Sequence, residues 1–249
     1  MTVSGPRTAV VTGASGGIGS AIVEAFLGCG TNVAAVDLQT EALREAFARE
    51  LAQDRLLLID CDLSQPQSWR NIVLAALDKF GRLEILVNNA ARIVRTGIFD
   101  ASEAEWDELV DVNLKASFFL SKLCADEMKK YKWGRIVNLS SQAGHSGGAV
   151  DCPIYAITKG GLNTMTRSFA RALAGHGVTV NAIAPGIVMT DMIQKTMSHD
   201  RINAVIDQIP IGRVTDAAEI AAAVMFLSSE NAGSITGHIL DINGGMLMR

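Results

Sequence analysis

Residues 8–19 read TAVVTGASGGIG, and this stretch decides the fold. It joins an apolar run to a glycine-rich turn and then to the start of an amphipathic helical pattern. Four glycines fall within residues 13–19, so few side chains keep a phosphate from backbone N–H groups, and the N-terminus of the following helix favours an anion. An ordinary tight turn is the alternative, because a glycine cluster alone is weak support for a phosphate site.

The same strand-then-helix pattern continues along the chain. The predicted strands are residues 8–12, 32–37, 55–60, 84–88, 135–139, 178–184 and 238–242. Several are apolar almost throughout, which is typical of strands covered on both faces. Between them, apolar residues recur at helical spacing, as at Ile18, Ile22 and Phe26. The alternation predicts an α/β fold with a parallel sheet, helices on both faces and one domain spanning residues 1–249.

Composition and charge argue against several classes of protein. The chain has 249 residues, of which 49% are apolar and 19% charged, with a net charge of −4 and a pI near 5.6. This balance gives no electrostatic argument for nucleic-acid binding. The four cysteines form no CxxC pair, so neither a metal site nor a disulfide framework is expected. No export signal and no apolar run of membrane length are found, which predicts a cytoplasmic protein without membrane contact.

Five further motifs follow TGASGGIG in a fixed order. They are Asn88-Asn89-Ala90-Ala91, Asn113, Ser140-Ser141, YAITK at residues 155–159, and Pro185-Gly186. Each is weak alone, but the ordered set is specific and spans essentially the whole chain. Together the motifs resemble the short-chain dehydrogenase/reductase family. The resemblance implies a doubly wound, Rossmann-type three-layer sandwich, a nicotinamide cofactor, a small alcohol or ketone substrate and a homotetramer.

The resemblance also implies a catalytic set. Tyr155 matches the acid/base, and Lys159 matches the partner that lowers its pKa and binds ribose. Ser141 matches the residue that holds the substrate oxygen, and Asn113 the anchor of a water in the proton relay. Physical chemistry agrees, because a phenol of pKa about 10 is a poor base at neutral pH and an ammonium one helical turn away favours the phenolate. A lone YxxxK would instead indicate a solvated helix face.

The implied cofactor contacts are spread over several turns. They are Gly13, Ser15, Gly16, Gly17, Ile18, Gly19, Asp37, Leu38, Asp62, Leu63, Asn89, Ala90, Ala91, Tyr155, Lys159, Pro185, Gly186, Val188 and Thr190. Asp62 and Leu63 match the positions that hold adenine. Ala91 departs from the family pattern, in which glycine is usual at this point.

Asp37 predicts NAD rather than NADP. It ends the second predicted strand, 24 residues beyond Gly13, near the spacing of a carboxylate that binds a ribose 2′-hydroxyl. A 2′-phosphate there would face a like charge. The positions where NADP-dependent relatives commonly carry a basic residue hold Gly16 and Leu38. The alternative is that Asp37 only caps the next turn.

The sequence says less about the substrate pocket than about the cofactor site. Pocket residues are predicted after the fourth strand, before Tyr155 and in the strand-free segment 190–213, which is predicted to be a substrate lid. They are Ile93, Ala143, His145, Cys152 and Met192. The Ser141–Tyr155 spacing is one residue longer than is common in the family, so the connecting loop is expected to bulge. A secondary alcohol and its ketone are the predicted pair; a 3-oxoacyl thioester and a polyol or sugar stay open.

A serine hydrolase and a non-catalytic nucleotide sensor are the alternatives from other functional classes. Residues 144–148, GHSGG, fit the GxSxG elbow of serine hydrolases, with Ser146 as nucleophile. That elbow needs a strand running into the serine and a helix after it, whereas the strand pattern stops about five residues earlier and Gly147, Gly148 and Pro153 predict no helix until about residue 153. A flexible loop on the substrate side is favoured. A non-catalytic nucleotide sensor would need a broken catalytic set, and this set is intact.

Overall fold

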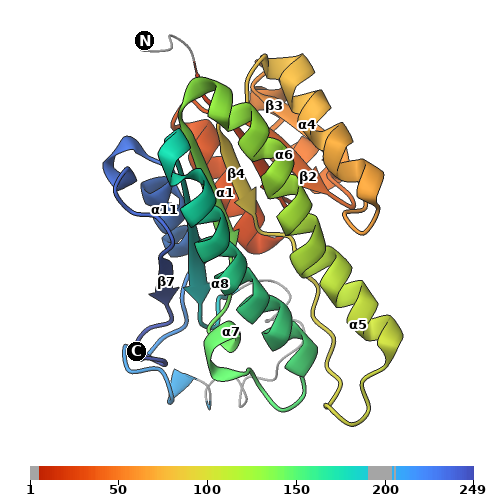
Figure 1. The fold of residues 1–249 in the computed structure, drawn as a ribbon, viewed down its shortest axis with the longest axis vertical. Coiled ribbons are helices and arrows are strands. Elements are labelled where there is room, and N and C mark those ends of the chain that lie inside the picture. Colours follow the sequence, from red (N-terminus) through yellow and green to blue (C-terminus); the bar gives the residue numbers. More distant parts are fainter. Residues whose placement is uncertain (1–5, 190–203, 205) are drawn as a thin grey trace.

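The computed structural model of the protein describes residues 6–189, 204 and 206–249. Within them one parallel sheet has the strand order β3-β2-β1-β4-β5-β6-β7 (Figure 1). The strands are β1 Thr8–Thr12, β2 Asn32–Asp37, β3 Leu56–Asp60, β4 Ile85–Asn88, β5 Gly134–Leu139, β6 Val178–Pro185 and β7 Ile239–Ile242. The predicted α/β fold is confirmed, and every predicted strand boundary lies within one residue of the observed one.

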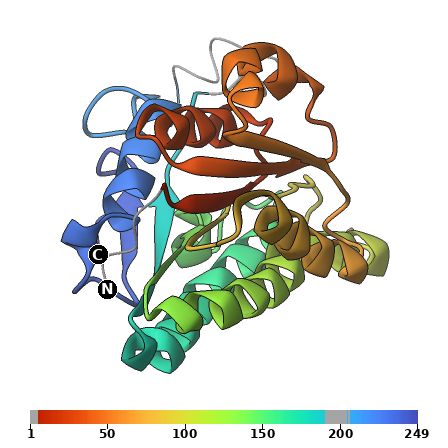
Figure 2. The same ribbon diagram turned by 90° about the horizontal axis from the view of Figure 1, so that it is seen from above.

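Helices cover both faces of the sheet, which gives three layers (Figure 2). One face is covered by α1 Gly17–Gly28 and α11 Ala217–Leu227, and the other by α4 Pro66–Phe80, α6 Ala116–Tyr131 and α8 Pro153–Leu173. The shorter elements are α2 Glu41–Ala46, α3 Ala48–Ala52, α5 Glu103–Val110, η1 Asp111–Lys115, α7 Ala143–Ser146, η2 Ala174–His176 and η3 Glu230–Ala232.

Apolar strand residues explain this arrangement. Successive side chains point to opposite faces, so Val11 packs under α1 and α11 while Val10 packs under α4 and α6. Both are fully buried. A strand that is apolar at every position therefore requires a helical layer on each side, which a parallel sheet with helical crossovers provides.

The direction in which strands are added reverses between β1 and β4. The chain builds β1, β2 and β3 toward one edge, then returns to place β4 on the other side of β1. The loops after β1 and β4 therefore diverge at the carboxyl end of the sheet. Ligands of doubly wound folds bind in the crevice that this reversal leaves.

Two predictions concern connecting segments, residues 190–213 and the residues just before Pro153. The predicted lid 190–213 falls largely on residues 190–203 and 205, which lie outside the described residues. The prediction that Gly147, Gly148 and Pro153 keep the chain out of helix until about residue 153 is confirmed, although one helical turn, α7 Ala143–Ser146, directly precedes Gly147. Across the described residues, no helix combines the length and apolar character that a membrane span requires.

The buried Glu84 carboxylate, just before β4, holds an ion pair and a hydrogen bond to β1, and its removal is expected to destabilise the protein. Glu84 is 1% exposed, pairs with Arg82 and accepts a 2.9 Å hydrogen bond from the Thr8 N–H. Glu84→Ala leaves both groups without this partner, so the free energy of unfolding should fall by about 3 kcal/mol in urea denaturation. As a control, Glu41→Ala removes an exposed pair with Arg44 and should cost less than about 1 kcal/mol. Equal losses in the two variants would contradict the prediction.

Candidate active site

A cleft of about 2030 Å³ opens at the carboxyl end of the sheet, between the loops after β1 and β4. Most predicted site residues line it. They are Gly13, Ser15, Gly16, Gly17, Ile18, Gly19, Asp37, Leu38, Asp62, Leu63, Asn89, Ala90, Ala91, Ile93, Ser141, Ala143, Tyr155, Lys159, Pro185, Gly186 and Val188. Residues that are up to 175 positions apart in the sequence therefore meet in one cavity, larger than the usual pocket for a drug-sized molecule.

The glycine loop leaves backbone donors free to meet an anion. Gly13 has φ +64°, and a Cβ there would lie 2.7 Å from the Ala90 Cα, so only glycine fits. A Cβ on Gly19 would lie 2.0 Å from the Gly13 carbonyl oxygen. No side chain caps the N-terminus of α1, and its first turn has no acidic residue. These residues fit the pyrophosphate of a dinucleotide, which would accept hydrogen bonds from the exposed N–H groups.

Asn89 fixes the loop after β4 against the glycine loop. Its side-chain Nδ2 donates to the Thr12 and Gly13 carbonyls at 3.0 and 2.8 Å. In return, the Thr12 hydroxyl oxygen accepts from the Asn89 and Ala90 N–H groups, both at 3.1 Å. The two walls of the cleft are thus joined at its floor by side-chain hydrogen bonds, which sets the width between them.

The Asp37 carboxylate lies at the end of β2, on the rim of the cleft. Its Oδ2 accepts from the Ser15 N–H at 2.9 Å, and its Oδ1 accepts from the Leu38 N–H at 2.7 Å. An ionised carboxylate has about four acceptor positions, so room remains for ribose hydroxyl groups. Leu38 is 60% exposed beside it and brings no charge. This arrangement fits a free 2′-hydroxyl.

Tyr155, Ser141 and Lys159 meet at the other end of the cleft. The Ser141 hydroxyl accepts from the Ala143 N–H at 3.1 Å and hydrogen-bonds to Tyr155. The Lys159 Nζ donates to the Leu139 carbonyl at 2.6 Å and lies 5.5 Å from the centroid of the Tyr155 ring. Tyr155 and Lys159 come from adjacent turns of α8, whereas Ser141 follows β5.

Burial shifts the pKa values of both Tyr155 and Lys159. Burial raises the pKa of Tyr155, and the Ser141 hydrogen bond opposes this only in part. Burial also lowers the pKa of Lys159 to about 7, so its positive charge is not assured at neutral pH. In the protein without cofactor, burial therefore dominates the pKa values of both groups, and the lowering of the tyrosine pKa by the lysine stays a prediction. Ribose hydroxyls beside Nζ would favour the ammonium form, because they accept its hydrogen bonds.

Asn113 lies beneath the cleft rather than on its surface. It belongs to η1, a π-helical turn, and is fully buried. Its Oδ1 accepts from the Arg92 N–H at 2.7 Å, while its Nδ2 donates to the Arg92 carbonyl at 2.9 Å and to Thr158 at 3.2 Å. These contacts fix the loop after β4 against α8. The predicted water-anchoring role of Asn113 stays a prediction.

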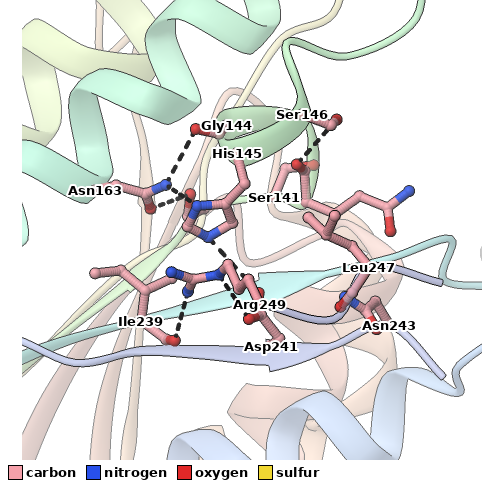
Figure 3. A network of polar contacts seen from close by, with 12 residues as sticks. Ser141, Gly144, His145, Ser146, Asn163, Ile239, Asp241, Asn243, Leu247 and Arg249 are labelled. Atoms are coloured by element: carbon pink, nitrogen blue, oxygen red, sulfur yellow. Dashed lines mark hydrogen bonds and ion pairs between the residues drawn. The ribbon is translucent and has the colours of Figure 1, made fainter. Parts of the chain in front are cut away.

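The predicted substrate-pocket residues lie in different places relative to the cleft. Ile93 and Ala143 line the cleft, but His145 and Cys152 do not. His145 points away, toward α8 and β7, because α7 places it on the side opposite to the cleft (Figure 3). Cys152 is buried at the N-terminus of α8. Met192 and the cofactor residue Thr190 lie outside the described residues.

Gln142 and Met246 are among the residues of the cleft wall that sequence reasoning missed. Gln142 directly follows Ser141, and that adjacency was a usable signal. Met246 has no such signal, because only the tertiary fold brings the C-terminal segment against the residues after β5. The Gln142 Nε2 lies 3.3 Å from the Met246 Sδ, so the two side chains form one wall.

The serine hydrolase alternative has no structural support. Ser146 ends α7 instead of standing between a strand and a helix. Its hydroxyl donates to the Gln142 carbonyl at 3.2 Å and accepts from the Gly148 N–H at 3.2 Å. The nearest histidine in sequence, His145, faces Asn163 and Asp241. Among the described residues, no histidine hydrogen-bonds to Ser146, so the structure shows no base that would activate it as a nucleophile.

Comparisons with known proteins agree with the geometry. A family model described as enoyl-(acyl carrier protein) reductase matches residues 13–247. The chain is 39% identical over 242 residues to 3-oxoacyl-[acyl-carrier-protein] reductase FabG of Vibrio cholerae, covering 97% of this chain and 98% of the relative. It is 36% identical to the FabG of Escherichia coli at the same coverage. A crystal structure of a short-chain dehydrogenase/reductase, glucose/ribitol dehydrogenase, from Brucella melitensis matches with a TM-score of 0.89 and 34% identity, covering 98% of this chain and 97% of that one.

The low pKa of Lys159 predicts a pH-dependent cost to stability. Between pH about 7 and 10.5 the unfolded chain binds a proton on Lys159 that the folded chain does not, so stability from this group rises with pH. Lys159→Met removes that penalty. Without cofactor, the variant should melt at a higher temperature than the wild type near pH 7.5, and the difference should shrink toward pH 10. A difference that is constant with pH would mean that Lys159 is charged in the folded protein throughout.

Proposed function

The chain belongs to the short-chain dehydrogenase/reductase family, and on this basis we propose that it interconverts a secondary alcohol and a ketone with NAD as its cofactor. The observation that carries the proposal is the meeting of Ser141, Tyr155 and Lys159 at one end of a cleft whose other end fits a dinucleotide. When bound, the nicotinamide supplies hydride transfer. The chain's own residues then bind, orient and move a proton.

Tyr155 is proposed as the proton carrier. In reduction its hydroxyl donates a proton to the carbonyl oxygen of the substrate, and in oxidation its phenolate accepts the proton of the alcohol. The Ser141 hydroxyl, which already bonds to Tyr155, holds that same oxygen. Lys159 retains further N–H donors beyond the bond to Leu139 and binds ribose with them. Burial of Lys159 keeps its donors from competing water.

A 3-oxoacyl thioester is the substrate class we favour, and reduction is then the relevant direction. The support is that the relatives named above are 3-oxoacyl-[acyl-carrier-protein] reductases that match nearly end to end. A sugar or polyol is the second candidate, because the matching crystal structure is of a glucose/ribitol dehydrogenase. The kcat/KM values for a 3-oxoacyl thioester and for a polyol, followed by the absorbance of reduced cofactor, would decide between them. No turnover of any alcohol or ketone would refute the proposal.

We further propose that residues 1–249 form one catalytic domain that assembles as a homotetramer in the cytoplasm. One sheet runs through the described residues, with glycine loop and catalytic tyrosine on the same edge. Phe118 and Phe119 on α6 are 42% and 38% exposed, and Ile157 on α8 is 51% exposed. Large apolar side chains on neighbouring helices favour burial against another subunit.

Tyr155→Phe tests the proton-transfer role. The change removes the hydroxyl but little contact area, so the dissociation constant for the cofactor should stay within about threefold while kcat falls about 10²–10⁴-fold. Stopped-flow turnover and cofactor titration by fluorescence would measure the two quantities. Retention of more than roughly a tenth of the wild-type kcat would show that another group carries the proton.

The cofactor preference tests Asp37. The unmodified protein should prefer NAD, and Asp37→Ala together with Leu38→Arg should raise the ratio of kcat/KM for NADP over NAD by at least about tenfold, equivalent to about 1.4 kcal/mol. Asp37→Asn is the matched control, since it removes the charge without adding a cation and should move the ratio less. A preference of the unmodified protein for NADP would refute this assignment.

A further inference from the structure

The C-terminal segment meets the residues that follow the catalytic serine. Figure 3 shows His145 of α7, Asn163 of α8, and Asp241 and Arg249 of the C-terminal segment gathered behind Ser141. The segment begins in β7 and ends with Arg249, the last residue of the chain. None of these four residues lines the cleft, so the cluster lies outside the site described above.

His145 connects two elements through its two ring nitrogens. The Asn163 Nδ2 lies 3.4 Å from the Gly144 carbonyl, which can only accept, and 3.4 Å from the His145 Nδ1. Nδ1 must therefore be the acceptor, and these partners assign the proton of neutral His145 to Nε2. Nε2 faces the Asp241 Oδ1 at 3.6 Å. Both of those atoms are buried and hydrogen-bond to no described residue.

Arg249 fixes the carboxylate that faces this histidine. Its Nε donates to the Asp241 Oδ2 at 2.9 Å, and its guanidinium also donates to the Ile239 carbonyl at 3.1 Å. The side chains of His145, Asp241 and Arg249 are 12%, 24% and 36% exposed, so solvent weakens these interactions only in part. One carboxylate thus connects the end of the chain to α7.

A second contact between the C-terminal segment and the residues before α7 lies in the wall of the cleft. Gln142, which directly precedes α7, donates to the Met246 Sδ at 3.3 Å, and both residues line the cleft beside Ser141. On its other side α7 packs closely against α8, since a Cβ on Gly144 would lie 2.7 Å from the Lys159 carbonyl carbon. α7 therefore has little freedom toward α8, and its position on the β7 side depends on the C-terminal segment.

We propose that Arg249, acting through Asp241 and His145, is a positioning residue that fixes α7 and so the Gln142–Met246 wall at the substrate end of the cleft. The proposal rests on the cleft being the substrate site, as proposed above. Arg249 touches neither substrate nor cofactor in this scheme. Its effect should appear in the affinity for substrate and not in that for the cofactor.

The charged groups around His145 set its pKa, so the affinity for substrate is expected to depend on pH. The imidazole faces Asp241 from β7, Arg249 from the C-terminal segment, and Asn163 and Arg167 from α8. Burial lowers the pKa of His145, Arg249 and Arg167 lower it further, and Asp241 opposes them. Removal of the Arg249 cation leaves Asp241 facing the imidazole, so the pKa of His145 should rise. Protonation would also place an N–H on Nδ1 against the Asn163 amide.

Arg249→Ala is the test. It should raise KM for the ketone substrate roughly tenfold, as expected for a lost charge-assisted hydrogen bond, while KM for the cofactor stays within about twofold. The inflection of substrate KM against pH should move to higher pH, and this shift should disappear when His145→Gln is added. Arg249→Lys should restore part of the affinity. Amide hydrogen exchange of residues 142–148 should quicken in Arg249→Ala and not in the strands.

Arg44→Ala is the matched control, because it removes an arginine from an exposed ion pair on α2. This variant should leave the substrate KM, its dependence on pH and the hydrogen exchange of residues 142–148 unchanged. The proposal is overturned if Arg249→Ala leaves both substrate KM and the exchange of residues 142–148 unchanged, if KM for substrate and cofactor rise together, or if the pH profile does not move. If no substrate is turned over, the proposed function fails, and the exchange experiment still decides whether Arg249 holds α7.

Discussion

The close approach between the turn after β1 and the loop after β4 is the constraint on which the rest of the structure depends. Gly13 meets the Ala90 backbone with no room for a side chain, and Asn89 bonds across to two carbonyls of the turn. A wider gap would separate the glycine loop from the end of the cleft that holds Ser141, Tyr155 and Lys159. A side chain at position 13 would prevent the contact altogether, because the backbone there has positive φ as well.

Buried polar side chains extend this constraint to α8. Asn88 donates to Asn138 at 2.8 Å and to Ser121 of α6, and Asn138 donates to Thr166 of α8 at 2.9 Å. One chain of side-chain hydrogen bonds thus runs from β4 through β5 to the helix that carries Tyr155. A buried network of this kind fixes the orientation of its side chains only when every polar group has a hydrogen-bond partner. The two amides are buried, so water cannot replace the partners that they have in the protein. The hydrogen bonds therefore hold α8 in register with the two strands beneath it.

Burial also shifts the pKa values of Tyr155 and Lys159, the proposed catalytic pair. The sequence places a lysine one turn from a tyrosine, and in water that lysine would be charged. In the folded protein Lys159 lies against the Leu139 carbonyl in a desolvated site, which lowers its pKa to about 7 and raises that of Tyr155. A charged lysine thus requires further hydrogen-bond acceptors at Nζ. A ribose would provide them, so under the proposed function cofactor binding would favour the charged form of Lys159.

The sequence alone determined the layers, the strands and most of the cleft. Apolar strands covered on both faces and glycines at a strand end are local patterns, so the α/β sheet was predictable to within a residue at each strand end. Only the tertiary structure decided where His145 points, what Asn113 holds, and that Met246 and Asp241 meet the residues after Ser141. Those contacts depend on the direction in which the single turn α7 faces and on the path of the C-terminal segment. Periodicity and spacing carry no information about either, because both arise from packing between residues far apart in the sequence.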